Sequence, residues 1–415
     1  MKRIEVKLDK VFGCEHEGYF LDSSSYDQVV DESCQVFDQE TGEKLIEFRK
    51  GSLTGELPED AFSTFKKVAT VTRNGNRGLA TGRKMDWEIM GRRRLSAGQK
   101  DVVTKGSKKK HGFKNFEEIE KILAENKDPS GFCWLSRSVK ELDWEGFLKE
   151  VKASDPEAWP DMFQAFGKKF VDRQRRQNLV SSNVFGAFGR TGRNPYCRLS
   201  LSTRKNPEKY REYAPFFHKV DEISQEAFPE RHASMKEGLS TTDPEFTLMG
   251  TAFTSITVNW NFRLASHFDG RNFPGGFATL TVFEKGDFDG HYLVFPEIRL
   301  AFNLREGDTI SADTHDLLHG NTAKEGEGER VSLVFFTRED VSKKCRSKEL
   351  DAAREAFWRW SKENLADVHA EGRTSWMGTF PGMYDSPEWY EFWEDYKERN
   401  SITGVELLEI DKLSG

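Results

Sequence analysis

The stretch that decides the fold is residues 276–313, "GFATLTVFEKGDFDGHYLVFPEIRLAFNLREGDTISAD". Short runs of β-branched and aromatic residues alternate here with turns that contain Gly and Asp, a pattern typical of strands. Similar runs flank the stretch, "FTLMGTAFTSITVNWNF" at 246–262 and "RVSLVFFT" at 330–337. About six strands at this spacing predict an all-β sandwich or barrel.

Helical patterns lie on both sides of this β-rich region. Apolar residues recur at intervals of three and four in 115–151, 207–228, 348–372 and 386–400, as they do in amphipathic helices. Residues 183–207 contain several glycines and are interpreted as a loop that leads into a short strand. We expect the many aromatic residues near the C-terminus to pack against the β core.

These patterns predict a mixed α+β fold class with three regions. Residues 1–180 form a basic N-terminal region, and residues 181–345 form the β domain. Residues 346–415 form a helical extension, rich in aromatic and acidic residues, that packs on the core.

Composition limits the class of protein. The 415 residues carry a net charge of −7, and no apolar run approaches the roughly 18 residues of a membrane span. The N-terminus lacks the apolar stretch of a secretory signal, so we expect an intracellular protein without a membrane partner, nuclear in a eukaryote and cytoplasmic otherwise. No CxxC pair is present, which predicts reduced, structural cysteines and neither a disulfide framework nor a cysteine zinc site. The five cysteines are Cys14, Cys34, Cys133, Cys197 and Cys345.

Positive charge is concentrated between Lys66 and Lys114, where fifteen Lys/Arg and three Asp/Glu give about +12. A second basic cluster, "KKFVDRQRRQ", occupies 168–177. Such segments are either solvated loops or surfaces that bind phosphates, and a nucleic-acid partner would favour the second. The candidate phosphate-binding residues are Arg92, Arg93, Arg94, Lys108, Lys109 and Lys110.

Candidate metal ligands lie in "HFDGRNFPGG", residues 267–276. His267 and Asp269 are two positions apart, so on an extended strand both side chains point to the same side. His319 follows fifty residues after Asp269. Two imidazoles and one carboxylate form the facial triad of non-haem iron oxygenases, which leaves open positions on the metal. His369 and Glu371 show the same spacing, but they lie in a predicted helix and no histidine follows to complete a site.

A candidate anion site follows the third ligand. Arg330 lies eleven positions after His319 and opens an apolar strand. Its planar guanidinium can pair with both oxygens of a carboxylate, such as the distal carboxylate of 2-oxoglutarate. Ser332 lies on the same face of the strand and could add a hydroxyl.

Together these motifs resemble the TET/JBP family of Fe(II)- and 2-oxoglutarate-dependent dioxygenases. The resemblance rests on His267-x-Asp269, on "GDFDGHYLVFPEIRLAFNLREGDTISAD", on His319-Gly-Asn-Thr and on Arg330-Val-Ser332. It covers about residues 185–340 and is strongest over 254–337. It implies a double-stranded β-helix, or jelly roll, that oxidises the 5-methyl group of cytosine or thymine in DNA.

The resemblance also implies roles for individual residues. His267, Asp269 and His319 would bind Fe(II), with O2 as the oxidant. The residues implied in 2-oxoglutarate binding are Arg330, Ser332 and His291.

Four further residues are implied or possible contacts of the substrate base. Asn272 matches the position of an asparagine that faces the flipped base, but it also suits a turn. Phe268 and Phe273 are candidates for stacking or for core packing. His315 is an alternative to His319 as ligand; the "HGNT" context favours His319, and His315 would then face the substrate or support the site. The implied partner is DNA with a methylated pyrimidine, bound by a monomer.

Three other functions compete with this interpretation. His315 and His319 in "HDLLH" resemble a zinc hydrolase motif, although that motif requires a helix. A jelly roll that has lost its metal site would be a binding module, but competent residues fill every position of this one. Other oxygenases of the same fold hydroxylate proteins or small molecules, and thymine hydroxylation is the alternative within the family.

Overall fold

The computed structural model describes residues 1–73 except 11, 13–15 and 17, residue 80, residues 179–365 except 192 and 193, and residues 383–405 except 385 and 404. The predicted helices in 115–151 and the six candidate phosphate-binding residues lie outside the described residues.

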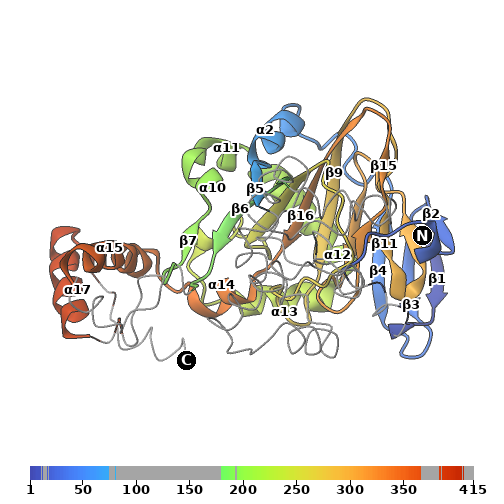
Figure 1. Cartoon of the computed structure of the whole chain (residues 1–415). Helices are drawn as coiled ribbons and strands as arrows, with labels where there is room; N and C mark the ends of the chain where they lie inside the picture. Colours follow the sequence, from blue (N-terminus) through green and yellow to red (C-terminus); the bar gives the residue numbers. More distant parts are fainter. Residues whose placement is uncertain are drawn as a thin grey trace, which may run out of the picture.

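One large sheet organises the described part of the chain (Figure 1). Its strands are β1 (Lys2–Val6), β3 (Cys34–Asp38), β4 (Lys44–Arg49), β13 (Thr309–Ala312), β9 (Ala278–Lys285), β16 (Glu329–Phe336), β8 (Ser255–Trp260), β6 (Leu179–Phe188) and β5 (Val71–Arg73), in spatial order, with β7 (Arg198–Leu199) paired to β6. All neighbours among these strands are antiparallel except β1 and β3.

A smaller sheet faces the large one. It has the order β14 (Gly320–Asn321), β11 (Leu293–Phe295), β12 (Leu300–Phe302) and β2 (Gln28–Val30). An isolated bridge between His267 and His319 continues this sheet next to β14. The β8-β16-β9-β13 order of the large sheet and the β14-β11-β12 order of the small one are those of a double-stranded β-helix, which confirms the predicted fold class.

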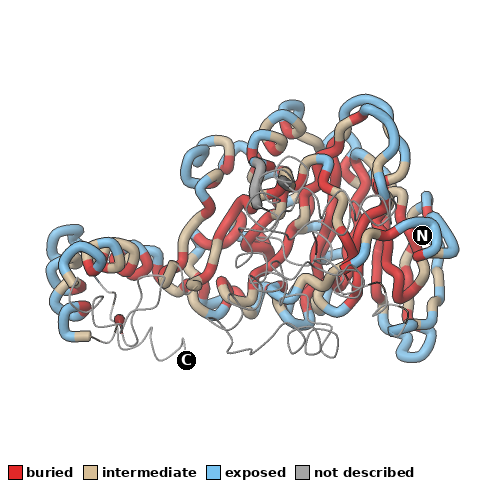
Figure 2. The backbone as a smooth tube through the Cα atoms, in the orientation of Figure 1, coloured by how far each residue is buried: buried red, intermediate tan, exposed pale blue. Residues whose placement is uncertain are grey.

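The core between the sheets is apolar. Leu280 and Ile310 from the large sheet pack in one cluster with Phe295 and Phe302 from the small sheet. Burying each of these side chains contributes about 1.5–3 kcal/mol to folding. Buried positions follow the strands of both sheets, whereas exposed positions gather at loops and outer helix faces (Figure 2).

Helices cover the outer face of the large sheet. α2 (Ala61–Val68) and α12 (Ala214–Ala227) contribute Phe65 and Phe217 to a second cluster that includes Phe335 of β16. Side chains along β16 therefore alternate between the helices and the jelly-roll interior, with Leu333 and Phe335 outward and Val334 inward. The predicted helix at 207–228 is present as α11 (Pro207–Glu212) and α12.

The segment 183–207 differs from its prediction as a loop. Residues 179–188 form the strand β6, which passes through Gly186. Gly186 has φ +107°, and a Cβ atom here would lie 2.4 Å from the carbonyl oxygen of Thr254. The glycine thus lets β6 approach β8 closely, and it does not interrupt the strand.

The N-terminal boundary predicted for the β domain, at 181, is wrong. β4 pairs with β13 in the large sheet, and β2 pairs with β12 in the small one. Residues 2–49 therefore extend both sheets of the jelly roll. Long-range strand pairing of this kind leaves no local pattern in a sequence.

The C-terminal helices α15 (Lys348–Asn364) and α17 (Pro387–Arg399) form where predicted, and Ser386 caps α17. Most of their aromatic residues pack in a cluster of their own that includes Phe357, Trp389 and Trp393, while Trp358 also contacts Tyr196 close to β7. The two helices lie to one side of the sheets (Figure 1).

The C-terminal helices are joined to the sheet region near β7. The side chain of Asp351 in α15 accepts the backbone N–H of Cys197 at 3.0 Å. Cys197 and Cys345 form a disulfide, which corrects the prediction of reduced cysteines for this pair. Cys34 is free and buried.

Among the helices of the described residues, none combines the length and the apolar character that crossing a bilayer requires.

Candidate metal centre

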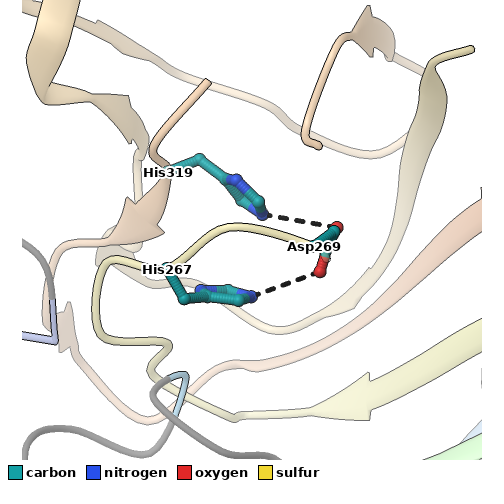
Figure 3. Close-up of side chains that lie close together, drawn as sticks. All are labelled: His267, Asp269 and His319. Atoms are coloured by element: carbon teal, nitrogen blue, oxygen red, sulfur yellow. Dashed lines mark ion pairs between the residues drawn. The ribbon is translucent and has the colours of Figure 1, made fainter. Parts of the chain in front are cut away.

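Two loops bring the three candidate ligands together. His267 and His319 exchange backbone hydrogen bonds, with N–O distances of 2.9 and 3.2 Å. Asp269, two residues after His267, turns its carboxylate toward both imidazoles (Figure 3). One potential ligand atom from each of the three residues lies within 4.8 Å of the other two.

The two imidazoles present the same nitrogen to Asp269. Nδ1 of His267 donates to the carbonyl of Ala265 at 2.9 Å, and Nδ1 of His319 donates to that of Leu317 at 3.1 Å. A carbonyl oxygen only accepts, so Nδ1 carries the proton in each ring and Nε2 is left with its lone pair. Backbone carbonyls that orient ligating histidines in this way are usual around protein metal sites.

The spacing of the three groups fits a shared cation. Nε2 of His267 lies 3.5 Å from Asp269 Oδ1, and Nε2 of His319 lies 3.6 Å from Oδ2. Both distances are long for a direct hydrogen bond. An imidazole lone pair and a carboxylate repel each other unless a cation lies between them, so this donor set suits a divalent metal such as Fe(II).

The protonation states also suit a metal. Burial lowers the pKa of His319 to about 4, and nearby His267 adds to this shift. Burial alone would raise the pKa of the Asp269 carboxyl, but its contacts with His267 and His319 hold that pKa well below its usual range. Near neutral pH the centre therefore has a neutral imidazole and a carboxylate available as ligands, the forms that bind metals.

Asn272 lies beside the ligands, and part of its hydrogen-bonding capacity is already used within the protein. Its backbone N–H donates to the Asp269 carbonyl in a turn, and its amide nitrogen donates to Thr314 Oγ1 at 2.9 Å. Asn272 is buried. Thr314, which no sequence motif marks, accepts the backbone N–H of Asp269 through its carbonyl, and its hydroxyl contacts the Asp269 carboxylate.

Phe273 packs away from the ligands. It joins the cluster under the helices, and its ring occupies the space beside Gly238, at the end of α13 (Pro229–Gly238). A Cβ atom at Gly238 would lie 2.6 Å from this ring. Of the two roles considered for Phe273, base stacking and core packing, this position corresponds to core packing.

Arg330 and Ser332 face the interior of the jelly roll. They share the face of β16 with Val334, which packs against the core between the sheets. Ser332 Oγ accepts from Asn259 Nδ2 at 3.4 Å, and both side chains are buried. The two predicted anion-binding residues therefore lie on the same inner wall.

Arg330 is a buried cation that no described carboxylate pairs with. It is 3% exposed, and its Nε has no hydrogen-bond partner among the described residues. Burial lowers the pKa of its guanidinium to about 10, although Glu284 opposes the shift. A buried charge without a counter-ion is costly, so this position favours an anionic ligand.

His291 lies close to Arg330. It is buried, with φ +54°, and Nε2 contacts the carbonyl of Phe262 at 3.2 Å while Nδ1 has no partner among the described residues. Burial lowers the pKa of His291 to about 3, and the charge of Arg330 adds to the shift. His291 is therefore neutral at physiological pH.

His315 is not part of the three-residue centre. It lies in a turn, and its Nδ1 contacts Asp316 at 2.6 Å on the exposed side of the loop. Because residues 313–319 form a turn and not a helix, His315 and His319 do not share a helix face. The zinc hydrolase alternative is therefore wrong.

Comparisons with known proteins agree on one part of the chain. Residues 185–339 match the Tet_JBP model, described as the oxygenase domain of the 2OGFeDO superfamily. The "Bifunctional helicase and thymine dioxygenase JBP2" of Trypanosoma brucei brucei is 34% identical over 146 residues, which are 34% of this chain and 13% of that protein. The "Thymine dioxygenase JBP1" of the same organism is 31% identical over 148 residues, covering 34% of this chain and 17% of that protein.

Among solved structures, the complex "NgTET1 in complex with 5mC DNA" aligns with 13% identity and a TM-score of 0.32, over 55% of this chain and 76% of that one. The chain spans less than a fifth of the length of the curated relatives described above. The matched segment nevertheless contains all three candidate ligands together with Arg330 and Ser332. Over residues 185–339, the chain is therefore similar to the oxygenase domains of the TET/JBP family.

Proposed function

We propose that this protein is a 2-oxoglutarate- and Fe(II)-dependent dioxygenase that oxidises the 5-methyl group of a pyrimidine base in DNA. The observation that carries the proposal is the centre of His267, Asp269 and His319 inside a segment that matches this oxygenase family. In the reaction, one oxygen atom of O2 enters the methyl group and the other enters succinate, while 2-oxoglutarate loses CO2. When bound, Fe(II) supplies the redox chemistry that couples these two oxidations.

The residues of the chain would bind and orient the reactants. His267, Asp269 and His319 hold the metal through two imidazole nitrogens and one carboxylate, which leaves metal positions for the cosubstrate and O2. Arg330 pairs with the distal carboxylate of 2-oxoglutarate, and Ser332 contributes a hydroxyl. His291 lies next to Arg330 as a neutral group that can contact the same ligand.

The substrate base is thymine or 5-methylcytosine. The similarity to the two thymine dioxygenases described above favours thymine. With 5-methylcytosine the first product would be 5-hydroxymethylcytosine, which further turnovers can oxidise. In either case the base must leave the duplex stack to reach a buried metal, and Asn272 and His315 lie on the two loops beside the ligands.

The basic segment would hold the DNA backbone. Arg92–Arg94 and Lys108–Lys110 belong to a region of about +12 charge within a chain of net charge −7. Contacts of this kind release counter-ions and raise affinity without reading sequence.

Reconstitution with defined DNA tests the proposal. The protein is loaded with Fe(II) without oxygen and then incubated in air with 2-oxoglutarate and duplex DNA, either unmethylated or methylated at cytosine. Oxidised nucleosides are measured by mass spectrometry.

Oxidised thymidine from both DNAs would identify a thymine oxygenase, and oxidised 5-methylcytidine from methylated DNA alone would identify the alternative. If a fully metal-loaded protein oxidised neither base, the proposed substrate class would be wrong.

A further inference from the structure

One arginine outside the ligand set connects the two loops that carry the ligands. Arg231, on α13, uses Nη1 to donate to the carbonyl of Gly276 at 3.0 Å and to Asp313 Oδ2 at 2.7 Å. Gly276 ends the loop that begins at His267, and Asp313 begins the loop that ends at His319. A single guanidinium nitrogen therefore bridges the two loops, in addition to the backbone bonds between His267 and His319.

Asp313 also forms hydrogen bonds with the turn that follows it. Its Oδ1 accepts the backbone N–H groups of His315 and Asp316, at 3.2 and 3.1 Å. Its Oδ2 is occupied by Arg231, and the residue is buried. With both oxygens bonded, the Asp313 side chain sets the conformation of residues 313–316.

Thr314, inside this turn, contacts the ligand Asp269 directly. The Thr314 carbonyl accepts the backbone N–H of Asp269 at 2.9 Å. The Thr314 hydroxyl also bonds the amide of Asn272, which closes the turn after Asp269. Hydrogen bonds and the intervening backbone thus connect Arg231 through Asp313 and Thr314 to the backbone of the candidate ligand Asp269.

The partial burial of Arg231 limits how far solvent screens these hydrogen bonds. Its side chain is 21% exposed, and that of Asp313 is 9% exposed. Charge-assisted bonds at such positions are screened less than surface pairs. The other partner of Arg231, Glu43, is 54% exposed, so that second contact is the weaker one.

We propose that Arg231 is a positioning residue for the metal centre, because it holds the two ligand loops at the separation that lets His267, Asp269 and His319 share one ion. The inference rests on the proposed metal site and is independent of the identity of the base. Groups that orient metal ligands typically contribute about 10- to 100-fold to metal affinity. We expect a loss of that size when the bond between Arg231 and Asp313 is removed.

The test measures metal binding to the full chain without turnover. Binding of Fe(II) under argon, and of Co(II) as a spectroscopic probe, is titrated for the wild type and for Arg231→Lys and Asp313→Asn. Arg231→Lys keeps the charge but loses the planar fork. Circular dichroism and melting temperatures show whether each variant is folded.

Two matched controls separate positioning from general stability. Arg299→Lys makes the same substitution at an arginine whose side chain bonds Asp27, which belongs to neither ligand loop. Glu43→Gln removes only the exposed partner of Arg231. Both controls should bind metal as the wild type does.

We expect Arg231→Lys and Asp313→Asn to bind metal about 10- to 100-fold more weakly, with an altered Co(II) spectrum. Their double variant should be little weaker than either single one, because both substitutions disturb the same contact between positions 231 and 313. Affinity within about twofold of wild type in the folded single variants, or an equal loss in Arg299→Lys, would overturn the role of Arg231 and leave the proposed function intact. A wild type that binds neither metal would overturn both.

Discussion

Arg330 and Glu284 occupy directly paired positions on β16 and β9, yet they do not form an ion pair. Glu284 instead lies 3.7 Å from Arg305, and burial raises the pKa of its carboxyl. The guanidinium of Arg330 is thus buried with an acidic neighbour that does not neutralise it. This arrangement leaves the charge of Arg330 available for the carboxylate of a ligand.

Replacing Arg330 by methionine should separate ligand binding from stability. Removing an unpaired buried charge is often neutral or stabilising, so the ligand-free variant should melt at or a few degrees above the wild-type temperature. Addition of 2-oxoglutarate with Mn(II) should raise the melting temperature of the wild type but not of Arg330→Met. Thermal unfolding followed by fluorescence measures both effects. Equal stabilisation of the two proteins by 2-oxoglutarate would contradict the role of Arg330.

Two histidines within the same region provide a matched test of the ligand set. His319→Ala should abolish detectable Fe(II) binding and succinate production, because one of three ligands is lost. His315→Ala, four residues earlier, should keep metal binding, because its ring contacts Asp316 outside the centre. Calorimetric titration of the apo proteins measures the difference. The reverse pattern would make His315 the ligand.

His291 should make stability depend on pH. Its pKa is about 3 in the folded protein, against about 6.5 in an unfolded chain. The unfolded state therefore binds more protons between these values, so the stabilisation is present above pH 6.5 and is lost as the pH falls. Between pH 7 and 5 the loss is about 2 kcal/mol.

The variant His291→Asn removes the titrating group, and asparagine tolerates the left-handed φ of +54° at this position. Urea unfolding of metal-free protein at pH 5 and 7 should give a smaller pH dependence for the variant. An unchanged pH dependence would show that His291 is not buried in its neutral form.

Charge reversal in the basic segment tests its proposed contact with DNA. Arg92→Glu, Arg93→Glu and Arg94→Glu together should weaken DNA binding and lower the salt slope of log Kobs by about 0.9 for each lost phosphate contact. The control reverses the same charge at Lys2 and Arg3 on the edge strand β1 and at Lys7, which follows it; their side chains are 48, 56 and 74% exposed. Fluorescence anisotropy over a salt series measures both triple variants. Equal salt slopes for the two triple variants would indicate that Arg92–Arg94 do not contact DNA phosphates.

Local patterns predicted the strands and much of the candidate site. The alternation over residues 330–337 places Arg330 and Ser332 on one face, and the structure has them there. The two-residue spacing of His267 and Asp269 likewise predicted that both side chains turn to one side. Such features depend on neighbours in the sequence, so the sequence alone reveals them.

Features that depend on distant segments were not predictable in this way. Nothing in residues 2–49 signals that they pair with strands near 300 and 310. Arg231 and Thr314 show their importance only through contacts made by the folded chain. The disulfide between Cys197 and Cys345, 148 residues apart, also depends on the fold.

The central claim is that the centre of His267, Asp269 and His319 couples 2-oxoglutarate decarboxylation to oxidation of a pyrimidine methyl group. The most direct measurement compares succinate and hydroxymethyl nucleoside formed on two DNA duplexes of the same sequence. The pyrimidines of one duplex are thymine and 5-methylcytosine. Those of the other are uracil and cytosine, so it has no 5-methyl group. We predict one succinate for each oxidation step on the methylated duplex and only background succinate on the methyl-free duplex. Equal succinate on both duplexes, without any oxidised nucleoside, would contradict the claim.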